Sequence, residues 1–147
     1  LSAGAARQTL LHTAWGKTGV TICYEAMFPR WARLDAERGA RLMINVTNNG
    51  WYKDTWGPRQ HYRANAFRAI ENRITVIRAG NTGISAVIDP WGVVTAERDL
   101  NVRGRLDADV PLNDPFPARS FYTRHGDWLG VGAIMLVILA VLRRYFQ

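Results

Sequence analysis

The stretch Gly19-Val20-Thr21-Ile22-Cys23-Tyr24-Glu25 combines a strand pattern with the only cysteine of the chain. Its first half is rich in β-branched residues, which favour strands. Pro29 follows shortly after and suits the first turn of a helix, where the N–H that proline lacks has no helical partner. The stretch therefore predicts a strand-to-helix turn that exposes a thiol, and backbone N–H groups near the helix start favour a thiolate or an oxyanion.

The segments on either side of this turn alternate between strand and helix patterns. The apolar run Leu42–Val46 is typical of a strand buried on both faces, and Asp89–Gly92 reads as a turn. Trp15-Gly16-Lys17 is predicted as a turn too, and Arg105–Val110 as a possible further strand. The order of the elements predicts an α/β layered domain. We expect strands at 8–14, 19–23, 42–46, 75–78, 84–88 and 93–96, and helices at 29–39 and 58–73.

Composition narrows the classes of function. The chain has 147 residues, a net charge of +7 and 48% hydrophobic residues, which suits one folded domain. The basic residues are scattered and no nucleic-acid motif accompanies them, so we expect no nucleic-acid partner. One cysteine excludes an internal disulfide, and three histidines without a Cys/His cluster predict no metal site.

The C-terminal part has a different character. Residues 111–117 contain three prolines and read as a linker, and Trp128–Leu142 carries no charge. We predict a membrane-spanning helix with Arg143-Arg144 on the cytoplasmic side and the folded domain outside; the alternative is a buried core helix. The predicted parts are a domain at 1–117, a juxtamembrane segment at 118–127 and a span at 128–145. Because the chain starts at Leu1 without a signal peptide, we expect it to be a C-terminal fragment.

Three segments together resemble the nitrilase-like carbon–nitrogen hydrolase superfamily. Gly19–Glu25 is similar to its nucleophile segment, Arg68–Asn72 to its helix motif, and Asn81–Gly92 to its late strand–turn–strand segment. This resemblance implies part of a four-layer αββα sandwich, here followed by one transmembrane helix.

Two further segments resemble the apolipoprotein N-acyltransferases within that superfamily. Asn48–Tyr52 followed by Gly57–His61 is similar to the family's segment after the nucleophile, and Phe121–Trp128 to its end before a hydrophobic helix. The chain departs from the family where Asn49 and Tyr52 stand in place of the common Asp and Phe, and where Ile74-Thr75 replaces Arg-Pro.

The resemblance implies a Glu–Lys–Cys triad, of which only Cys23 maps onto this chain. Lys17 and Lys53 do not match the position of the family's lysine, and the family's Glu and Lys lie upstream of the nucleophile segment. Among the catalytic residues we count Cys23 as the nucleophile and Glu25 as the residue that orients the site. Among the substrate-binding residues we count Tyr24, through its backbone N–H, and Trp51, at the lipid entrance. Glu25 could instead be a surface or structural carboxylate and Trp51 a core residue, whereas His61 and His125 read as surface or helix-capping residues.

The function implied by the resemblance is transfer of a fatty acyl chain from a phospholipid, through a Cys23 thioester, to the amino terminus of a diacylglyceryl-cysteine lipoprotein. It needs no cofactor. The expected place is the bacterial inner membrane, with the catalytic domain in the periplasm. Two alternatives stay open: a carbon–nitrogen hydrolase (amidase), in which water replaces the amine, and a non-catalytic membrane-tethered module of the same fold.

Overall fold

The computed structural model describes residues 8–53, 55–110, 112 and 119–146. Six strands form one sheet in chain order. β2, β3 and β4 are parallel, and the remaining neighbours are antiparallel. The strands are β1 (Leu11–Thr13), β2 (Gly16–Ile22), β3 (Leu42–Asn48), β4 (Thr75–Asn81), β5 (Ser85–Ile88) and β6 (Val94–Arg98).

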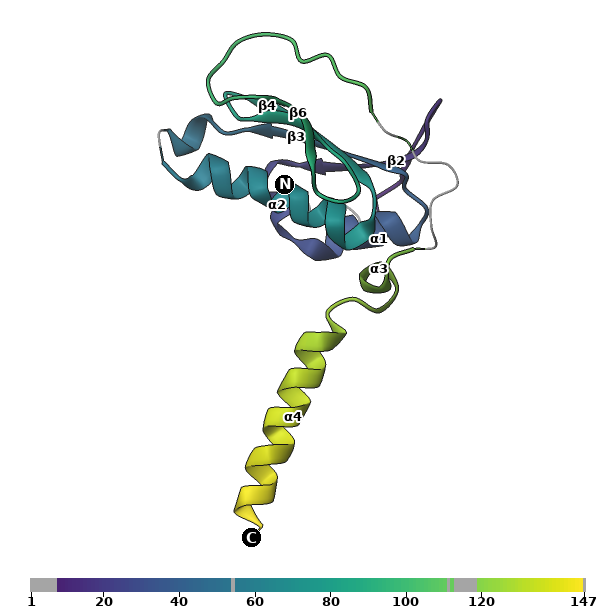
Figure 1. Ribbon diagram of the computed structural model, residues 1–147, viewed down its shortest axis with the longest axis vertical. Coiled ribbons are helices and arrows are strands. Elements are labelled where there is room, and N and C mark those ends of the chain that lie inside the picture. Colours follow the sequence, from purple (N-terminus) through teal and green to yellow (C-terminus); the bar gives the residue numbers. More distant parts are fainter. Residues whose placement is uncertain (1–7, 54, 111, 113–118, 147) are drawn as a thin grey trace.

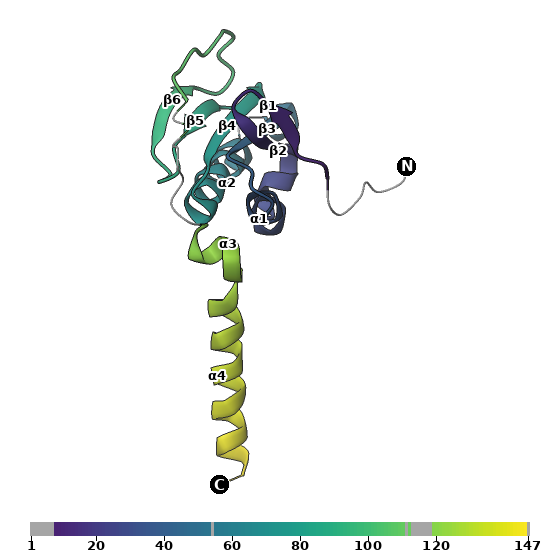
Figure 2. The ribbon, with the colours of Figure 1, turned by 90° about the vertical axis from the view of Figure 1, so that its right-hand side faces the viewer.

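Helices connect the parallel strands and lie on one face of the sheet (Figure 2). Between these helices and the sheet, Met43, Val76 and Ile88 are fully buried against alanines of both helices. The described part is therefore one sheet with one helix layer, a mixed α/β fold. The helical elements are η1 (Cys23–Met27), α1 (Pro29–Glu37), η2 (Gly50–Tyr52), α2 (Gly57–Asn72), α3 (Phe121–His125) and α4 (Trp128–Tyr145).

The other face of the sheet carries apolar side chains that are only partly covered. Side chains alternate between the two faces of a strand, so Ile44 and Val46 point away from the helices that cover Met43. Val46 is 40% exposed, and its neighbour Ile22 on β2 is 59% exposed. In the part of the chain described, the expectation that Leu42–Val46 is buried on both faces therefore holds at Leu42, which is 2% exposed, and is wrong at Val46.

Most predicted elements are confirmed, with two corrections. The first hairpin turns at Ala14–Trp15, and Gly16, at a φ of 104°, already pairs with Thr13 as the first residue of β2. Residues 105–110 form no strand; they belong to the long connection that arcs away from the sheet after β6 (Figure 1). The predicted linker at 111–117 lies, apart from Leu112, outside the described residues.

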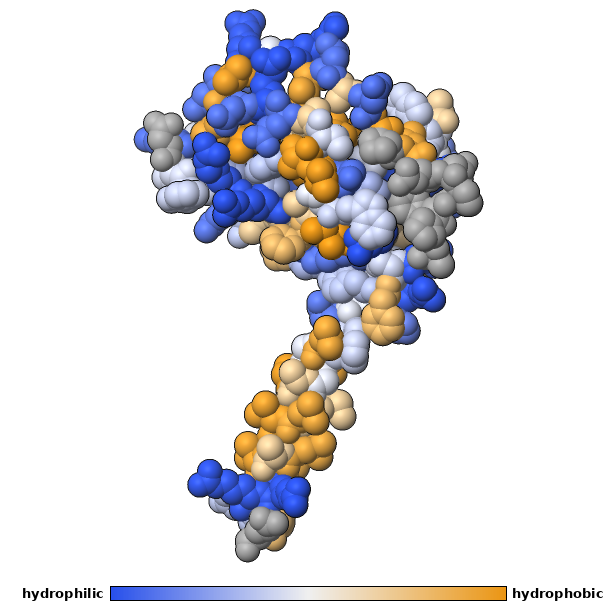
Figure 3. Space-filling model, in the orientation of Figure 1, coloured by the Kyte–Doolittle hydropathy of each residue, from blue (hydrophilic) through white to orange (hydrophobic). Residues whose placement is uncertain are grey.

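The last two helices differ in their contacts. The short α3 is tied to the end of α2, since Thr123 Oγ1 donates to Asn72 Oδ1 at 3.1 Å and Ser120 Oγ bonds the Glu71 carbonyl. Beyond α3, α4 projects from the body as an apolar rod with hydrophilic side chains at its end (Figures 1 and 3). None of α4 is buried against the rest of the described chain, so it is not a core helix of this domain, and its length and composition suffice to cross a membrane.

Candidate active site around Cys23

Cys23 lies where the parallel strand β2 ends and η1 begins, as predicted. Its φ is 50°, a left-handed conformation that is uncommon for a residue with a side chain. Asn48 and Asn81 end the neighbouring parallel strands at the same edge of the sheet. Sites in open α/β sheets lie outside the carboxyl ends of such strands. The partly buried thiol of Cys23 therefore occupies a position typical of a reactive group.

Two side chains hold the backbone carbonyl of Cys23. The Nε2 of His61, in the first half of α2, lies 2.7 Å from this oxygen. The Nδ2 of Asn45, from the middle of β3, donates to it at 3.3 Å. His61 is 2% exposed, so the prediction of a surface or helix-capping role is wrong for this histidine.

A buried arginine organises the polar side chains behind Cys23. Arg78 is 1% exposed, and its Nη1 and Nη2 donate to Asn45 Oδ1 at 2.6 Å and to Asn49 Oδ1 at 2.8 Å. Its Nε donates to the Ile84 carbonyl at 3.0 Å. Burial lowers the pKa of Arg78 to about 10, although the proximity of Cys23 and Tyr62 raises it. Arg78 therefore stays protonated at neutral pH and supplies a positive charge near the thiol.

The surroundings of His61 favour its neutral form. Burial is the largest cause of a lowered pKa of His61; its bond to the Cys23 carbonyl acts in the opposite direction, and the positive charge of Arg78 lowers the pKa further. On its other side, Nδ1 lies 3.2 Å from the Nδ2 of Asn49. The ring is thus bonded at both nitrogens, at one of them to the backbone carbonyl of Cys23.

The segment motifs have structural explanations. Arg68 reaches from α2 to the carbonyls of Ala26 and Met27, both at 3.2 Å, and thereby ties down the end of η1. It also bonds Glu71 at 2.8 Å. In the late motif, Gly83 leaves the space that Asn49 fills, since a Cβ there would stand 2.5 Å from Asn49 Oδ1.

Glu25 caps the turn on which Cys23 sits. Its Oε2 accepts the backbone N–H of Ile22 at 2.7 Å, so it closes η1 onto the end of β2. In this arrangement the carboxylate shapes the backbone on both sides of Cys23.

The other predicted residues are more exposed. Tyr24 is 52% exposed and contacts the ring of Phe28 edge-on at 5.7 Å. Trp51, on η2, is 86% exposed, so it is not a core residue. Lys17 bonds the Arg38 carbonyl at 3.4 Å at the far end of β2, and Lys53 is exposed after η2.

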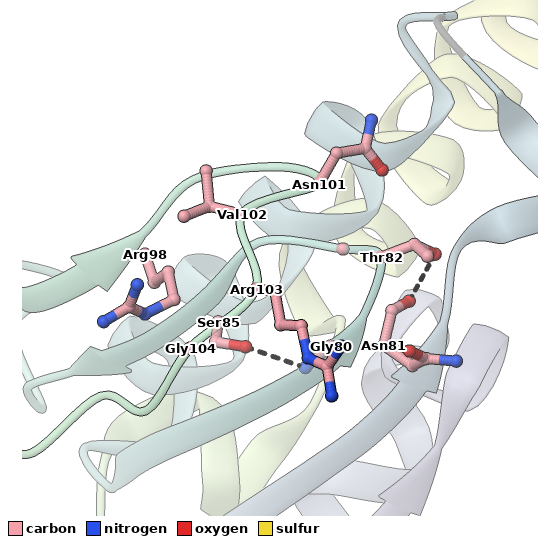
Figure 4. A pocket seen from close by; sticks show the side chains of 10 residues that line it. Gly80, Asn81, Thr82, Ser85, Arg98, Asn101, Val102, Arg103 and Gly104 are labelled. Carbon is pink, nitrogen blue, oxygen red and sulfur yellow. Dashed lines mark hydrogen bonds between the residues drawn. The ribbon is translucent and has the colours of Figure 1, made fainter.

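A pocket of about 390 Å³ opens between the end of β4 and the connection that follows β6. In Figure 4, Gly80, Asn81 and Thr82 line one side, and Arg103 extends toward Gly80 from the other. Asn81 also accepts the backbone N–H of Asn49 at 3.1 Å, which links this loop to the residues behind Cys23. The pocket therefore adjoins the site without containing the thiol.

Sequence reasoning did not find Asn45, His61 and Arg78. The sequence did contain a signal, namely polar residues inside predicted strands. Asn45 interrupts an apolar strand, and Arg78 lies within the strand pattern at 75–78. Buried polar groups of this kind must find partners, and at the end of a parallel sheet these partners form a site.

Comparison with known proteins identifies the family. The model of the carbon–nitrogen hydrolase family matches residues 2–119. Apolipoprotein N-acyltransferases of Geobacter metallireducens, Bradyrhizobium diazoefficiens and Agrobacterium fabrum are 36%, 46% and 41% identical over 91%, 82% and 93% of the chain. The chain spans only 21–26% of the length of these relatives.

Solved structures agree with this assignment. An amidase mutant from Nesterenkonia sp. AN1, with acrylamide added at its active-site cysteine, matches with a TM-score of 0.59 and 28% identity over 84% of this chain and 50% of that one. Saccharomyces cerevisiae Nit3, of the nitrilase superfamily, matches with a TM-score of 0.55 and 31% identity over 68% of this chain and 39% of that one. The chain belongs to the carbon–nitrogen hydrolase family, and its curated relatives are apolipoprotein N-acyltransferases.

Proposed function

We propose that this chain carries the nucleophile of an apolipoprotein N-acyltransferase. The observation that carries the proposal is Cys23 itself: a thiol on a left-handed turn at the carboxyl ends of parallel strands, with the cation Arg78 buried nearby. In the first step the thiolate attacks the ester carbonyl of a phospholipid, the ester C–O bond breaks and a lysophospholipid leaves. In the second step the amino terminus of a diacylglyceryl-cysteine lipoprotein attacks the thioester, and the C–S bond breaks as the amide forms.

The remaining site residues take supporting roles in this proposal. The backbone N–H of Tyr24 donates to the tetrahedral oxyanion. Glu25 orients the turn, and its bond to the N–H of Ile22 supports that role. The exposed indole of Trp51 lines the lipid entrance, since an amphipathic ring suits the membrane interface. The general base and the lysine of the family's triad come from outside these 147 residues.

The proposed setting is the bacterial inner membrane, with the domain in the periplasm and the C-terminus in the cytoplasm. The exposed apolar α4 supports a membrane span, and Arg143 with Arg144 supports its orientation. The partly uncovered face of the sheet supports packing against a second sheet, as in a four-layer αββα sandwich.

Hydrolysis of an amide is the second candidate, because an amidase is among the similar solved structures. Water then replaces the lipoprotein amine at the thioester. The apolar α4 favours acyl transfer from a lipid over amide hydrolysis. A lipid substrate lies in the membrane, whereas an enzyme that acts on a soluble amide needs no membrane anchor. A membrane-tethered module without catalysis is the third possibility, and it predicts no acyl adduct.

The test is the covalent intermediate. We expect the complete protein, incubated with phospholipid, to carry one hydroxylamine-sensitive acyl adduct that mass spectrometry places on Cys23. Cys23→Ala should lack it, and Cys23→Ser should trap little, because a hydroxyl is a far weaker nucleophile near neutral pH. An adduct that persists in Cys23→Ala would refute the assignment. The acceptor of the acyl group separates the two reactions. Release of the thioester only when a diacylglyceryl peptide is added indicates transfer, whereas release in water alone indicates hydrolysis.

A further inference from the structure

We propose that His61 is a positioning residue, which holds the Cys23 carbonyl from behind and thereby aims the backbone N–H of Tyr24 at the reacting acyl group. The inference rests on the proposed function, since it assumes an oxyanion at this N–H. It assigns a role in the chemistry to a histidine whose ring nitrogens bond Asn49 and the Cys23 carbonyl rather than the thiol, and whose ring centroid lies 5.9 Å from that of Tyr24.

Arg78 sets the orientation of two neighbouring amide side chains. A guanidinium only donates hydrogen bonds, so the two amides that it contacts must turn their oxygens toward it. Asn45 and Asn49 therefore both present Oδ1 to Arg78. Their Nδ2 groups consequently point the other way, toward the backbone of Cys23 and toward the ring of His61.

This orientation determines the tautomer of His61. Because the Nδ2 of Asn49 donates, the Nδ1 of His61 must accept, at 3.2 Å. The proton of the neutral ring is then on Nε2, which donates to the Cys23 carbonyl at 2.7 Å. The lowered pKa of His61 keeps the ring in this neutral form.

The consequence for catalysis follows from the planar peptide. The carbonyl of Cys23 and the N–H of Tyr24 belong to one trans peptide unit, in which they point in opposite directions. Donors from His61 and Asn45 on the oxygen side therefore orient the N–H on the other side. Without them, this peptide could rotate, because Cys23 sits in an unfavourable left-handed conformation at a φ of 50°.

A matched pair of variants tests the idea in the complete protein. The amide nitrogen of His61→Gln corresponds to Nε2 and can still reach the Cys23 carbonyl, whereas that of His61→Asn corresponds to Nδ1 and cannot. We expect His61→Asn to lower kcat for thioester formation at least about tenfold with little change in KM, since one oxyanion donor contributes about a hundredfold or more. His61→Gln should recover most of the loss. The exposed His12 provides the control: His12→Asn should match the wild type.

Alkylation of Cys23 by iodoacetamide supplies the second readout. This displacement passes through no oxyanion, so a misaimed Tyr24 N–H should leave its rate within about threefold while acylation falls at least about tenfold. Equal losses in both reactions would indicate general disorder of the turn and overturn the proposal, as would wild-type acylation in His61→Asn. Acyl transfer that survives in Cys23→Ala would instead refute the proposed function itself.

Discussion

At the scale of single residues, the site depends on a buried cation, Arg78, whose hydrogen bonds within the described residues go to neutral oxygens. Burying a charge is costly unless hydrogen bonds replace its hydration. Arg78 meets this condition through neutral oxygens of Asn45, Asn49 and Ile84. Because no carboxylate of the described residues pairs with Arg78, its positive charge can act on the thiolate or oxyanion proposed at Cys23.

The same environment predicts a pH dependence of stability. The folded-state pKa of His61 lies below its ordinary value of 6.5, so the unfolded chain binds the proton more readily. The stabilisation is therefore complete above pH 6.5 and is lost as the pH falls through the lowered pKa. Thermal unfolding of the complete protein should show this loss on acidification, and His61→Gln, which cannot titrate, should reduce it.

Asn49→Asp provides a control with the opposite sign. A carboxylate between Arg78 and His61 has no N–H to give but accepts a hydrogen bond from a protonated Nδ1 of His61, so it would favour the charged ring. We expect the pKa of His61 to rise above its ordinary value of 6.5, so that stability is lost as the pH rises through this raised value. If stability depended on pH in the same way in His61→Gln, in Asn49→Asp and in the wild type, the titration of His61 would not be the cause of the acid loss.

At the scale of elements, the turn η1 is held from two directions. Arg68 of α2 bonds the carbonyls at the end of η1, and Glu25 closes its start onto β2. Burial raises the pKa of Glu71, which Arg68 partly offsets as its ion-pair partner. The turn that bears Cys23 is thus fastened at both ends to the helix layer and the sheet.

Glu25 offers a way to separate capping from acid–base chemistry. An amide oxygen can accept the N–H of Ile22 as a carboxylate does, so Glu25→Gln should retain activity within a few fold if the residue only shapes the turn. Glu25→Ala should cost roughly 0.5–2 kcal/mol of stability, as loss of a helix cap does, with a matching loss of activity. Denaturant unfolding and acyl transfer, measured on both variants, distinguish the two roles. An inactive Glu25→Gln variant with full stability would show that the carboxylate takes part in the chemistry.

At the scale of the whole molecule, two apolar surfaces are left open by the described part of the chain. One is the sheet face around Ile22, Ile44 and Val46, and the other is the length of α4. Exposed apolar patches of this kind mark surfaces that pack against another layer or a membrane.

The 147-residue chain alone should transfer no acyl group and should need detergent to stay soluble. Of the triad that the family resemblance implies, this chain carries only the proposed nucleophile, and its open sheet face invites association. Transfer from phospholipid to a diacylglyceryl peptide, measured with the purified chain, tests this. Turnover that disappears in Cys23→Ala would show that the chain supplies its own base and oxyanion donor.

The second prediction at this scale concerns α4. We expect α4 to span the membrane with Gln147 in the cytoplasm, since Arg143 and Arg144 flank its uncharged length. A reporter enzyme that functions only in the cytoplasm should be active when it is fused after Gln147. Activity of a reporter that functions only in the periplasm would contradict the orientation. The 147-residue chain truncated before Gly126 should lose its association with membranes, whereas continued partitioning would leave α4 without an anchoring role.

The sequence by itself determined what depends on neighbouring residues. The β-branched residues before Cys23 and the proline at position 29 place a strand end and a helix start on either side of the thiol. The segment motifs identified the family, and the uncharged run at 128–142 identified the apolar helix. Local pattern failed at residues 105–110, where a strand-like sequence makes no ladder, because a strand exists only if another strand pairs with it.

Only the tertiary structure decided what surrounds the thiol. His61 lies 38 residues from Cys23 along the chain, and Arg78 lies 33 and 29 residues from the two asparagines it orients. No local period records such separations. They arise because the parallel pairing of β2, β3 and β4 brings the carboxyl ends of the strands to one edge, where α2 packs against η1. A histidine that reads as a surface residue in the sequence is therefore buried against the backbone of Cys23.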